Sequence, residues 1–411
     1  MSASPAGCKA RHVGAITETG GGLEPYRDPE PFSVTAQGHE LTFHPGGGDR
    51  LAALLAMIAG AQTSLDICFY IFAEDKCGVA VRDALVAAAG RGVAVRLMID
   101  GFGSNQTATA FFDPLCAAGG QFCCFSARPS VRYLVRNHQK MVIVDAGTGG
   151  AAAMIGGFNV EHDYFTPPAE NGWNDLGVVL TGPAVAQLAQ WFDRLHAWTA
   201  DPKAQWRAMR RLVREWDPGT GPVQWLMGGP TRGLSPWARR VSEDLRAGTK
   251  LDMIMAYFSP ALRLLGRIGR IARAGETRLL LAAKSDNGAT IGASRLLYGK
   301  LLKRGAKIWE FSPCKLHTKL IVLDDAVYLG SANFDMRSLY INLELMLRIE
   351  DKALAERMRE FVGRHLSASL EVTDAVHRER RTLFNRLRWT LSWFLVAVVD
   401  YTVSRRLNLG L

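Results

Sequence analysis

The sequence contains two copies of one pattern, NHQKMVIVD at residues 137–145 and LHTKLIVLD at residues 316–324. In each copy a histidine is followed by a lysine two residues later, and by an aspartate after four apolar residues. Side chains on a strand alternate between its faces, so the histidine and lysine of each copy share a face. The apolar run after each lysine predicts a strand buried in a core.

A turn of small residues and an asparagine follow each copy, as Gly156-Gly157-Phe158-Asn159 and Gly330-Ser331-Ala332-Asn333. Glycine lets the backbone approach a ligand closely, and asparagine adds a hydrogen-bond donor. Two copies with the same trailing residues favour one composite site over the alternative, which is unrelated surface histidines. The predicted site residues are His138, Lys140, Asp145, Asn159, His317, Lys319, Asp324 and Asn333.

These residue types suit an anionic phosphodiester better than a metal ion. A lysine on the same face as a histidine repels a cation, whereas it attracts phosphate oxygens. The histidines supply a nucleophile and an acid for the leaving group, and the lysines supply positive charge, all without a metal. We therefore expect no metal and no cofactor.

The segments around the two copies repeat as well. Ser64–Phe72 reads SLDICFYIF and Lys250–Phe258 reads KLDMIMAYF, and both are rich in β-formers. Helical patterns flank each of them, which predicts an α/β fold made of two similar lobes. The expected division is a flexible extension at 1–40, a first lobe at 41–215, a second lobe at 216–372 and a basic, apolar tail at 373–411.

The composition indicates which partners the protein binds and in which redox compartment it is found. The 411 residues suit two domains, and the net charge of +10 favours a polyanion, either nucleic acid or an anionic membrane. The seven cysteines are irregularly spaced without a CxxC pair, which favours buried free thiols in a reducing compartment. The first residues contain no apolar stretch typical of a secretory signal.

The C-terminal part contains an apolar run, WTLSWFLVAVVDYTV at residues 389–403. The run is short for a bilayer-spanning helix, and Asp400 interrupts it. Arginines flank it on both sides, among them Arg386 and Arg388, so the pattern favours an interfacial helix on an anionic membrane. The alternative is a terminal helix docked on the protein's own core.

The paired motifs resemble the HKD signature of the phospholipase D superfamily, and the chain is most similar to bacterial cardiolipin synthases. The resemblance extends over about residues 46–372, and LHTKLIVLDDAVYLGSANFDMRSLYINLE (316–344) is particularly typical. It implies two phospholipase D-like α/β/α lobes related by a pseudo-twofold axis. The active site then lies at the interface between the lobes.

The resemblance also implies a double displacement through a phosphohistidine, with His138 as nucleophile and His317 as acid. Lys140, Lys319 and the two motif asparagines would hold the phosphoryl oxygens. Each histidine needs an acceptor that orients its far nitrogen, and the residues predicted for this are Asp175 and Glu344.

Other residues receive secondary roles. Asp145 and Asp324 stand at odd spacing from their histidines, so they are expected to fix a turn rather than to bond the imidazoles. The residues expected to contact a lipid headgroup are Ser331, Arg337 and Ser338. Tyr70 and Tyr257 occupy matching positions in the two halves, where lobe packing is the simplest explanation.

The predicted function is cardiolipin synthase-like phosphatidyl transfer between phospholipids at the cytoplasmic face of the bacterial inner membrane. The partners are then an anionic phospholipid membrane and its lipids, with no nucleic acid expected. Three alternatives use the same fold: a hydrolytic phospholipase D that releases phosphatidic acid, a nuclease, and an inactive binding module. The sequence leaves the acceptor and the oligomeric state open.

Overall fold

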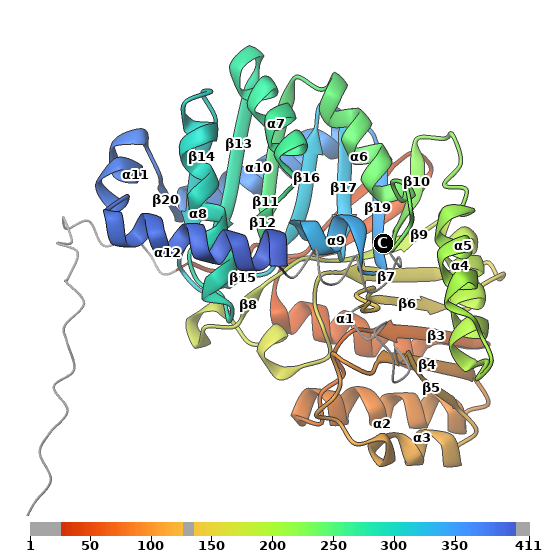
Figure 1. Cartoon of the computed structure of the whole chain (residues 1–411). Helices are drawn as coiled ribbons and strands as arrows, with labels where there is room; N and C mark the ends of the chain where they lie inside the picture. The colour runs from red at the N-terminus through yellow and green to blue at the C-terminus, as the bar shows by residue number, and fades with distance from the viewer. Residues whose placement is uncertain (1–25, 126–134, 400–411) are drawn as a thin grey trace, which may run out of the picture.

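Each half of the chain folds around an eight-stranded mixed sheet in the computed structural model, which describes residues 26–125 and 135–399 (Figure 1). In both sheets three neighbouring parallel strands are continued on one side by a run of antiparallel strands. This arrangement confirms the predicted α/β fold with two similar lobes.

The first lobe places the strand of the first histidine motif beside the SLDICF strand. β6 (Met141–Val144) runs antiparallel to β3 (Ser64–Phe69), which is parallel to β4 (Ala94–Asp100). The remaining strands are β1 (Phe32–Ala36), β2 (His39–His44), β5 (Gln121–Phe125), β7 (Ala152–Gly156) and β9 (Gly177–Thr181). The helices are α1 (Gly47–Gly60), α2 (Lys76–Gly90), α3 (Asp113–Ala117), α4 (Ala184–Ala200) and α5 (Trp206–Arg214).

The second lobe repeats this order. β16 (Lys319–Leu323) runs antiparallel to β11 (Lys250–Met255), which is parallel to β13 (Glu276–Ala282). The remaining strands of this sheet are β10 (Val223–Gly228), β14 (Lys307–Phe311), β17 (Ala326–Gly330), β19 (Glu344–Glu350) and β20 (Ser369–Glu371). The helices up to residue 367 are α6 (Pro236–Ala247), α7 (Leu262–Ala274), α8 (Gly288–Leu302), α9 (Met336–Tyr340) and α10 (Lys352–Ser367).

A shared hydrophobic core joins the two lobes. It contains Trp191 of α4, Trp225 of β10 and Phe361 of α10 together with inward residues of both sheets. Each lobe has a second core on the other face of its sheet. Burial of large aromatic side chains in the shared core fixes the lobes against each other, which a site at their interface requires.

The prediction that residues 1–40 form a flexible extension is wrong for the last residues of this range. Residues 1–25 lie outside the described residues, but β1 pairs with β2 along the edge of the first sheet. Alternating burial along β1 and stacking of Phe32 on Phe43 explain the pairing. The polar, Pro-containing sequence before β1 concealed this short strand.

The tail predicted at 373–411 folds as α11 (Asp374–Arg380), α12 (Leu383–Trp393) and a π-helical turn (Phe394–Val399). Residues 400–411 lie outside the described residues. α12 contacts α8 along the second lobe, with Trp389 buried between them. Within 26–125 and 135–399, no helix has both the length and the apolar character needed to cross a bilayer.

Candidate active site

Each histidine motif is attached to the opposite lobe by backbone hydrogen bonds. The His138 N–H donates to the Leu343 carbonyl at 2.9 Å, and Asn137 forms a bridge with Leu343. In the second motif, the short strand β15 (Lys315–Leu316) pairs with β8 (Trp173–Asn174), and the His317 N–H donates to the Asn174 carbonyl at 2.8 Å. The main chain at both histidines is therefore held by the interface between the lobes.

The orienting carboxylates also come from the opposite lobe. His138 Nδ1 lies 3.0 Å from Glu344 Oε2, and His317 Nδ1 lies 2.6 Å from Asp175 Oδ2. The sequence identified both carboxylates but did not assign them to histidines. With Nδ1 held by a carboxylate, the Nε2 atom of each ring is the one available for chemistry.

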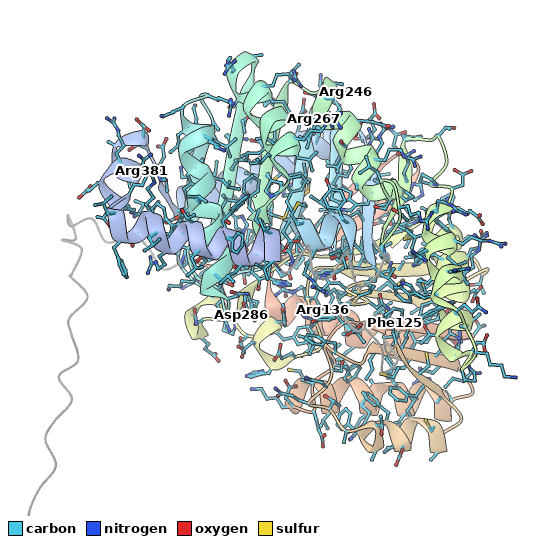
Figure 2. The ribbon with its side chains drawn as sticks, viewed as in Figure 1. Phe125, Arg136, Arg246, Arg267, Asp286 and Arg381 are labelled. Atoms are coloured by element: carbon cyan, nitrogen blue, oxygen red, sulfur yellow. The ribbon has the colours of Figure 1, made fainter. Side chains whose placement is uncertain are left out.

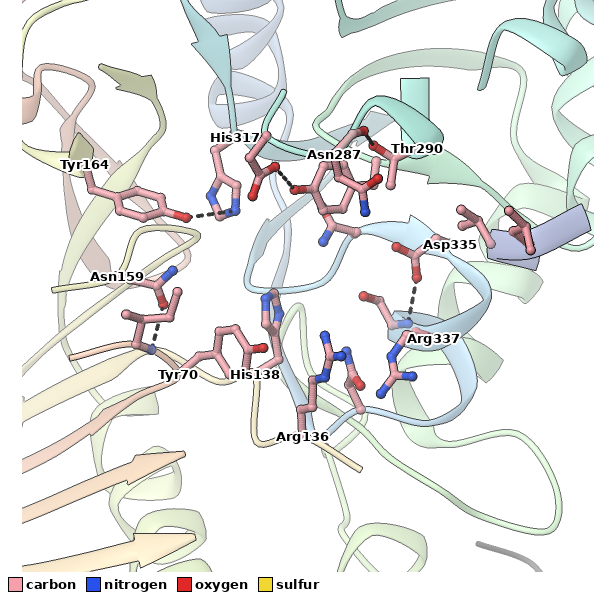
Figure 3. Close-up of a pocket in the computed structure, with 18 residues that line it drawn as sticks. Tyr70, Arg136, His138, Asn159, Tyr164, Asn287, Thr290, His317, Asp335 and Arg337 are labelled. Atoms are coloured by element: carbon pink, nitrogen blue, oxygen red, sulfur yellow. Dashed lines mark hydrogen bonds between the residues drawn. The ribbon is translucent and has the colours of Figure 1, made fainter. Parts of the chain in front are cut away.

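The two histidines line one cavity of about 510 Å³ at the interface. Figure 3 shows their rings facing each other, with Tyr70, Asn159 and Tyr164 on one side. The opposite side carries Asn287, Thr290, Asp335 and Arg337 (Figure 3). One cavity reached by both imidazoles fits a single reacting phosphate between them.

The lysines of both motifs are almost completely buried beside the histidines. Lys140 Nζ donates to the His138 carbonyl at 2.7 Å, and Lys319 Nζ donates to the His317 carbonyl at 2.5 Å. The two side chains are 1% and 2% exposed. Lys319 Nζ also lies 2.9 Å from His317 Nδ1. Neither lysine is among the described residues that line the cavity, so both lie directly behind the histidines.

The motif asparagines also line the cavity. Asn159 Oδ1 accepts a hydrogen bond from the Ile71 N–H at 3.2 Å, and its amide group also interacts with Tyr164 beside the cavity. Asn333 is 4% exposed, and its Oδ1 atom has no hydrogen-bond partner among the described residues. A buried carbonyl oxygen without a donor is costly, so a ligand hydroxyl that donates a hydrogen bond to it would gain free energy.

Burial and the neighbouring lysines favour the neutral form of both imidazoles. Burial lowers the pKa of His138 well below its usual value, and Lys140 and Lys319 add to the effect. Burial and Lys319 lower the pKa of His317 to about 3, although Asp175 opposes the shift. A bound anionic phosphate reverses this balance by favouring the protonated ring.

The charged groups around the histidines are perturbed as well. Burial lowers the pKa of Lys140 to about 7 and that of Lys319 to about 8. Burial raises the pKa of Glu344 to about 7, against the attraction of Lys140. For Asp175 burial also acts upward, but Lys319 and His317 together outweigh it and the pKa is lowered. Such clustering of shifted pKa values is typical of a reaction centre.

The motif aspartates lie at the opposite end of their strands from the histidines. Asp145 accepts hydrogen bonds from the N–H groups of Gln62, Thr63 and Ser64, and Asp324 does the same for Thr249 and Lys250. Both aspartates have positive φ, at 51° and 49°. They fix the turn after each strand, which confirms the role expected from their spacing. They are not among the described residues that line the cavity, so counting them among the site residues was wrong.

Of the three expected headgroup contacts, only Arg337 and Ser338 line the cavity. Ser331 instead donates from its hydroxyl to Glu344 Oε2 at 2.5 Å. The serine of the Gly-Ser-Ala-Asn turn therefore stabilises the carboxylate that orients His138. The expectation that it contacts substrate is wrong for Ser331.

Tyr70 and Tyr257 were expected to pack between the lobes, but both line the cavity. The Tyr70 ring meets His138 edge-on with centroids 4.9 Å apart, and Tyr164 and Trp173 surround His317 in the same way. Arg136 also lines the cavity, between the two lobes (Figure 2). Its position next to the first motif was a signal that the sequence analysis did not use.

A further missed residue is Arg50, which is fully buried at the start of α1. Its guanidinium donates to the carbonyls of Asp175 at 2.5 Å, Tyr164 at 2.7 Å and Trp173 at 3.1 Å, and to that of Pro45. The arginine thereby holds the segment that presents Asp175 to His317. The available signal was an arginine directly before the apolar run LAALLAMIA at residues 51–59.

Comparison with known proteins shows which family the chain belongs to. A family model described as "Cardiolipin synthase, PLD-like domain" matches residues 54–196 and 245–366. Cardiolipin synthase B of Escherichia coli (strain K12) is 27% identical over 366 residues, covering 87% of each chain. Cardiolipin synthase A of Pseudomonas fluorescens (strain SBW25) is 30% identical over 352 residues, covering 82% of this chain and 70% of the relative.

The fold also matches a solved structure. The crystal structure of phosphatidylserine synthase from Haemophilus influenzae Rd KW20 superposes with a TM-score of 0.69 at 14% identity, covering 91% of this chain and 96% of the other. This likeness shows that the two proteins share the two-lobe fold. Since the family model spans both histidine motifs, the chain belongs to the cardiolipin synthase family of phospholipase D-like proteins.

Proposed function

We propose that the protein is a phosphatidyl transferase that forms cardiolipin by joining two phospholipids. The observation that carries the proposal is the pair of imidazoles in one cavity, each held at Nδ1 by a carboxylate of the other lobe. Relatives named cardiolipin synthase, similar over most of the chain, support the choice of reaction.

In the proposed first step, His138 Nε2 attacks the phosphorus of phosphatidylglycerol. The bond from phosphorus to the glycerol oxygen breaks, and His317 gives its Nε2 proton to that oxygen. The products are free glycerol and a phosphatidyl group bound to His138. Lys140, Lys319 and the motif asparagines hold the phosphoryl oxygens, whose negative charge also raises the pKa of His317 so that it carries the proton.

In the second step, His317 removes a proton from the hydroxyl of a second phosphatidylglycerol. The alkoxide attacks phosphorus, the bond to His138 breaks, and cardiolipin leaves. The acid of the first step thus becomes the base of the second, as microscopic reversibility requires. Glu344 and Asp175 stabilise the positive imidazolium on each side.

We also infer that the protein works on the membrane that holds its substrates, at the cytoplasmic face of the bacterial inner membrane. The free thiols of the six described cysteines support a reducing compartment. Phospholipids reside in the bilayer, so the enzyme must collect them there.

The test is to incubate the purified protein with phosphatidylglycerol vesicles and to identify the lipid products by mass spectrometry. Cardiolipin and glycerol are expected from the wild type and neither from His138→Ala. Phosphatidic acid as the sole product would overturn transfer in favour of hydrolysis. Absence of lipid turnover, with cleavage of nucleic acid, would overturn the lipid substrate altogether.

A further inference from the structure

A stripe of exposed apolar side chains runs along α12 and the π-helical turn that follows it. Of the ten large apolar side chains exposed within the described residues, seven lie here, spaced mostly three or four residues apart. They are Leu383, Phe384, Leu387, Leu391, Phe394, Leu395 and Val399, exposed between 87% and 37%. A contiguous apolar surface of this kind marks a binding face, because scattered exposed residues would not concentrate on one helix.

The opposite face of α12 already holds the helix to the protein. Trp389 is 2% exposed and stacks on His377 with ring centroids 5.7 Å apart, and Trp393 packs against the core of the second lobe. Docking on the protein therefore needs only the tryptophan face. The apolar stripe is a second face with a separate purpose.

A basic notch lies beside the stripe, between α8 and α12. This cavity of about 260 Å³ is lined by Lys300, Lys303, Arg381 and Arg386, and no carboxylate is among its lining residues. By contrast, Arg380 close by forms an ion pair with Glu310 at 2.9 Å. Four basic side chains around one cavity fit an anionic phosphate group. Arg381 marks this end of the surface in Figure 2.

The stripe is continuous with the active site. Leu395 and Val396, in the π-helical turn that follows α12, line the cavity that contains His138 and His317. In Figure 1, α12 runs along the edge of the second lobe from α11 toward α9, at the junction of the lobes. A body bound along the stripe would therefore lie next to residues that line the active-site cavity.

We propose that α12 and the following turn are a docking surface for an anionic phospholipid bilayer, which deepens and rests on the proposed function. The apolar side chains of the stripe insert into the membrane surface, and the basic notch binds a lipid phosphate. The active-site cavity then opens toward the membrane. A second copy of the chain fits less well, because residues 383–399 contain no carboxylate that could pair with the basic notch of a partner. The bilayer offers apolar and anionic groups side by side.

The test compares two leucines with the same exposure. Leu391 on the stripe and Leu262 on α7 are both 55% exposed. We expect Leu391→Glu to weaken sedimentation with vesicles of phosphatidylglycerol and phosphatidylcholine by roughly tenfold, and Leu262→Glu to leave it unchanged. Lys303→Ala with Arg386→Ala should weaken binding mainly at low salt and only where phosphatidylglycerol is present.

Activity separates docking from chemistry. Leu391→Glu should lower turnover of phosphatidylglycerol in vesicles but not of dihexanoyl phosphatidylglycerol dissolved below its critical micelle concentration. Wild-type vesicle binding by Leu391→Glu overturns the proposal. The proposal is also overturned if the wild-type protein is a dimer and Leu391→Glu is a monomer that still binds vesicles. Vesicle binding without any lipid turnover would instead contradict the proposed function and leave the docking surface standing.

Discussion

Glu344 of the second lobe accepts the hydrogen bond of His138 Nδ1 in the first lobe, at 3.0 Å. Asp175 makes the reciprocal contact with His317 at 2.6 Å. Neither lobe alone contains a histidine with its orienting carboxylate. The reaction centre therefore exists only when the shared core has closed the lobes against each other.

The first prediction concerns this crossed arrangement. Glu344→Gln keeps the size of the side chain but removes the charge that stabilises the His138 imidazolium, so kcat should fall by about 10²–10⁴-fold. The measurement is kcat with phosphatidylglycerol, together with the melting temperature. A similar fall in kcat is expected for Asp175→Asn. Near-wild-type kcat in either folded variant would contradict the orienting role.

A second prediction concerns pH. Burial lowers the pKa of Lys140 to about 7 and of Lys319 to about 8, so both lose their protons as the pH rises through these values. In the proposed mechanism the protonated ammoniums hold the phosphate, so kcat/KM should fall on the alkaline side between about pH 7 and 8. Bound phosphate favours the ammonium, so the corresponding fall in kcat should lie at higher pH. A kcat/KM profile flat to pH 9 would exclude the lysines from binding phosphate.

The sequence could predict the elements that carry the motifs. β6, β16 and the paired strands β3 and β11 follow from apolar runs whose periodicity is local. Alternation of side chains also placed each histidine and lysine on one face. These features depend on neighbours along the chain, and such patterns are visible in a single sequence.

The crossed contacts could not be predicted in this way. Asp175 and Glu344 were identified, but their assignment depends on how two folded lobes meet. Arg50 was missed because its partners are backbone carbonyls, which leave no mark in the sequence. The tail was described by two alternatives, and both faces of α12 turn out to be apolar, with Trp389 inward and Leu391 outward.

A third prediction concerns Gly157, in the turn after the first motif. A Cβ atom at this position would lie 2.7 Å from Asp175 Oδ1 and 3.0 Å from Lys319 Nζ. Gly157→Ala must therefore displace the carboxylate that orients His317, and kcat should fall by roughly 10²-fold. The control is Gly48→Ala, since nothing lies within 4 Å of its Cβ position. Equal activity in the two variants would show that the contact is easily relieved.

The last prediction concerns Arg50 and separates support of the fold from support of the site. Arg50→Met leaves four buried carbonyls without their charged donor, which should lower the free energy of unfolding by about 3–5 kcal/mol. Arg91 also donates to carbonyls, those of Ile58 and Ala59, but it lies at the surface. Arg91→Met should therefore change stability by less than about 1 kcal/mol, because water replaces the lost donor. Urea denaturation of both variants gives the comparison. Because Arg50 also holds the segment of Asp175, the folded fraction of Arg50→Met should have a lower kcat than Arg91→Met, and an unchanged kcat would limit Arg50 to a structural role.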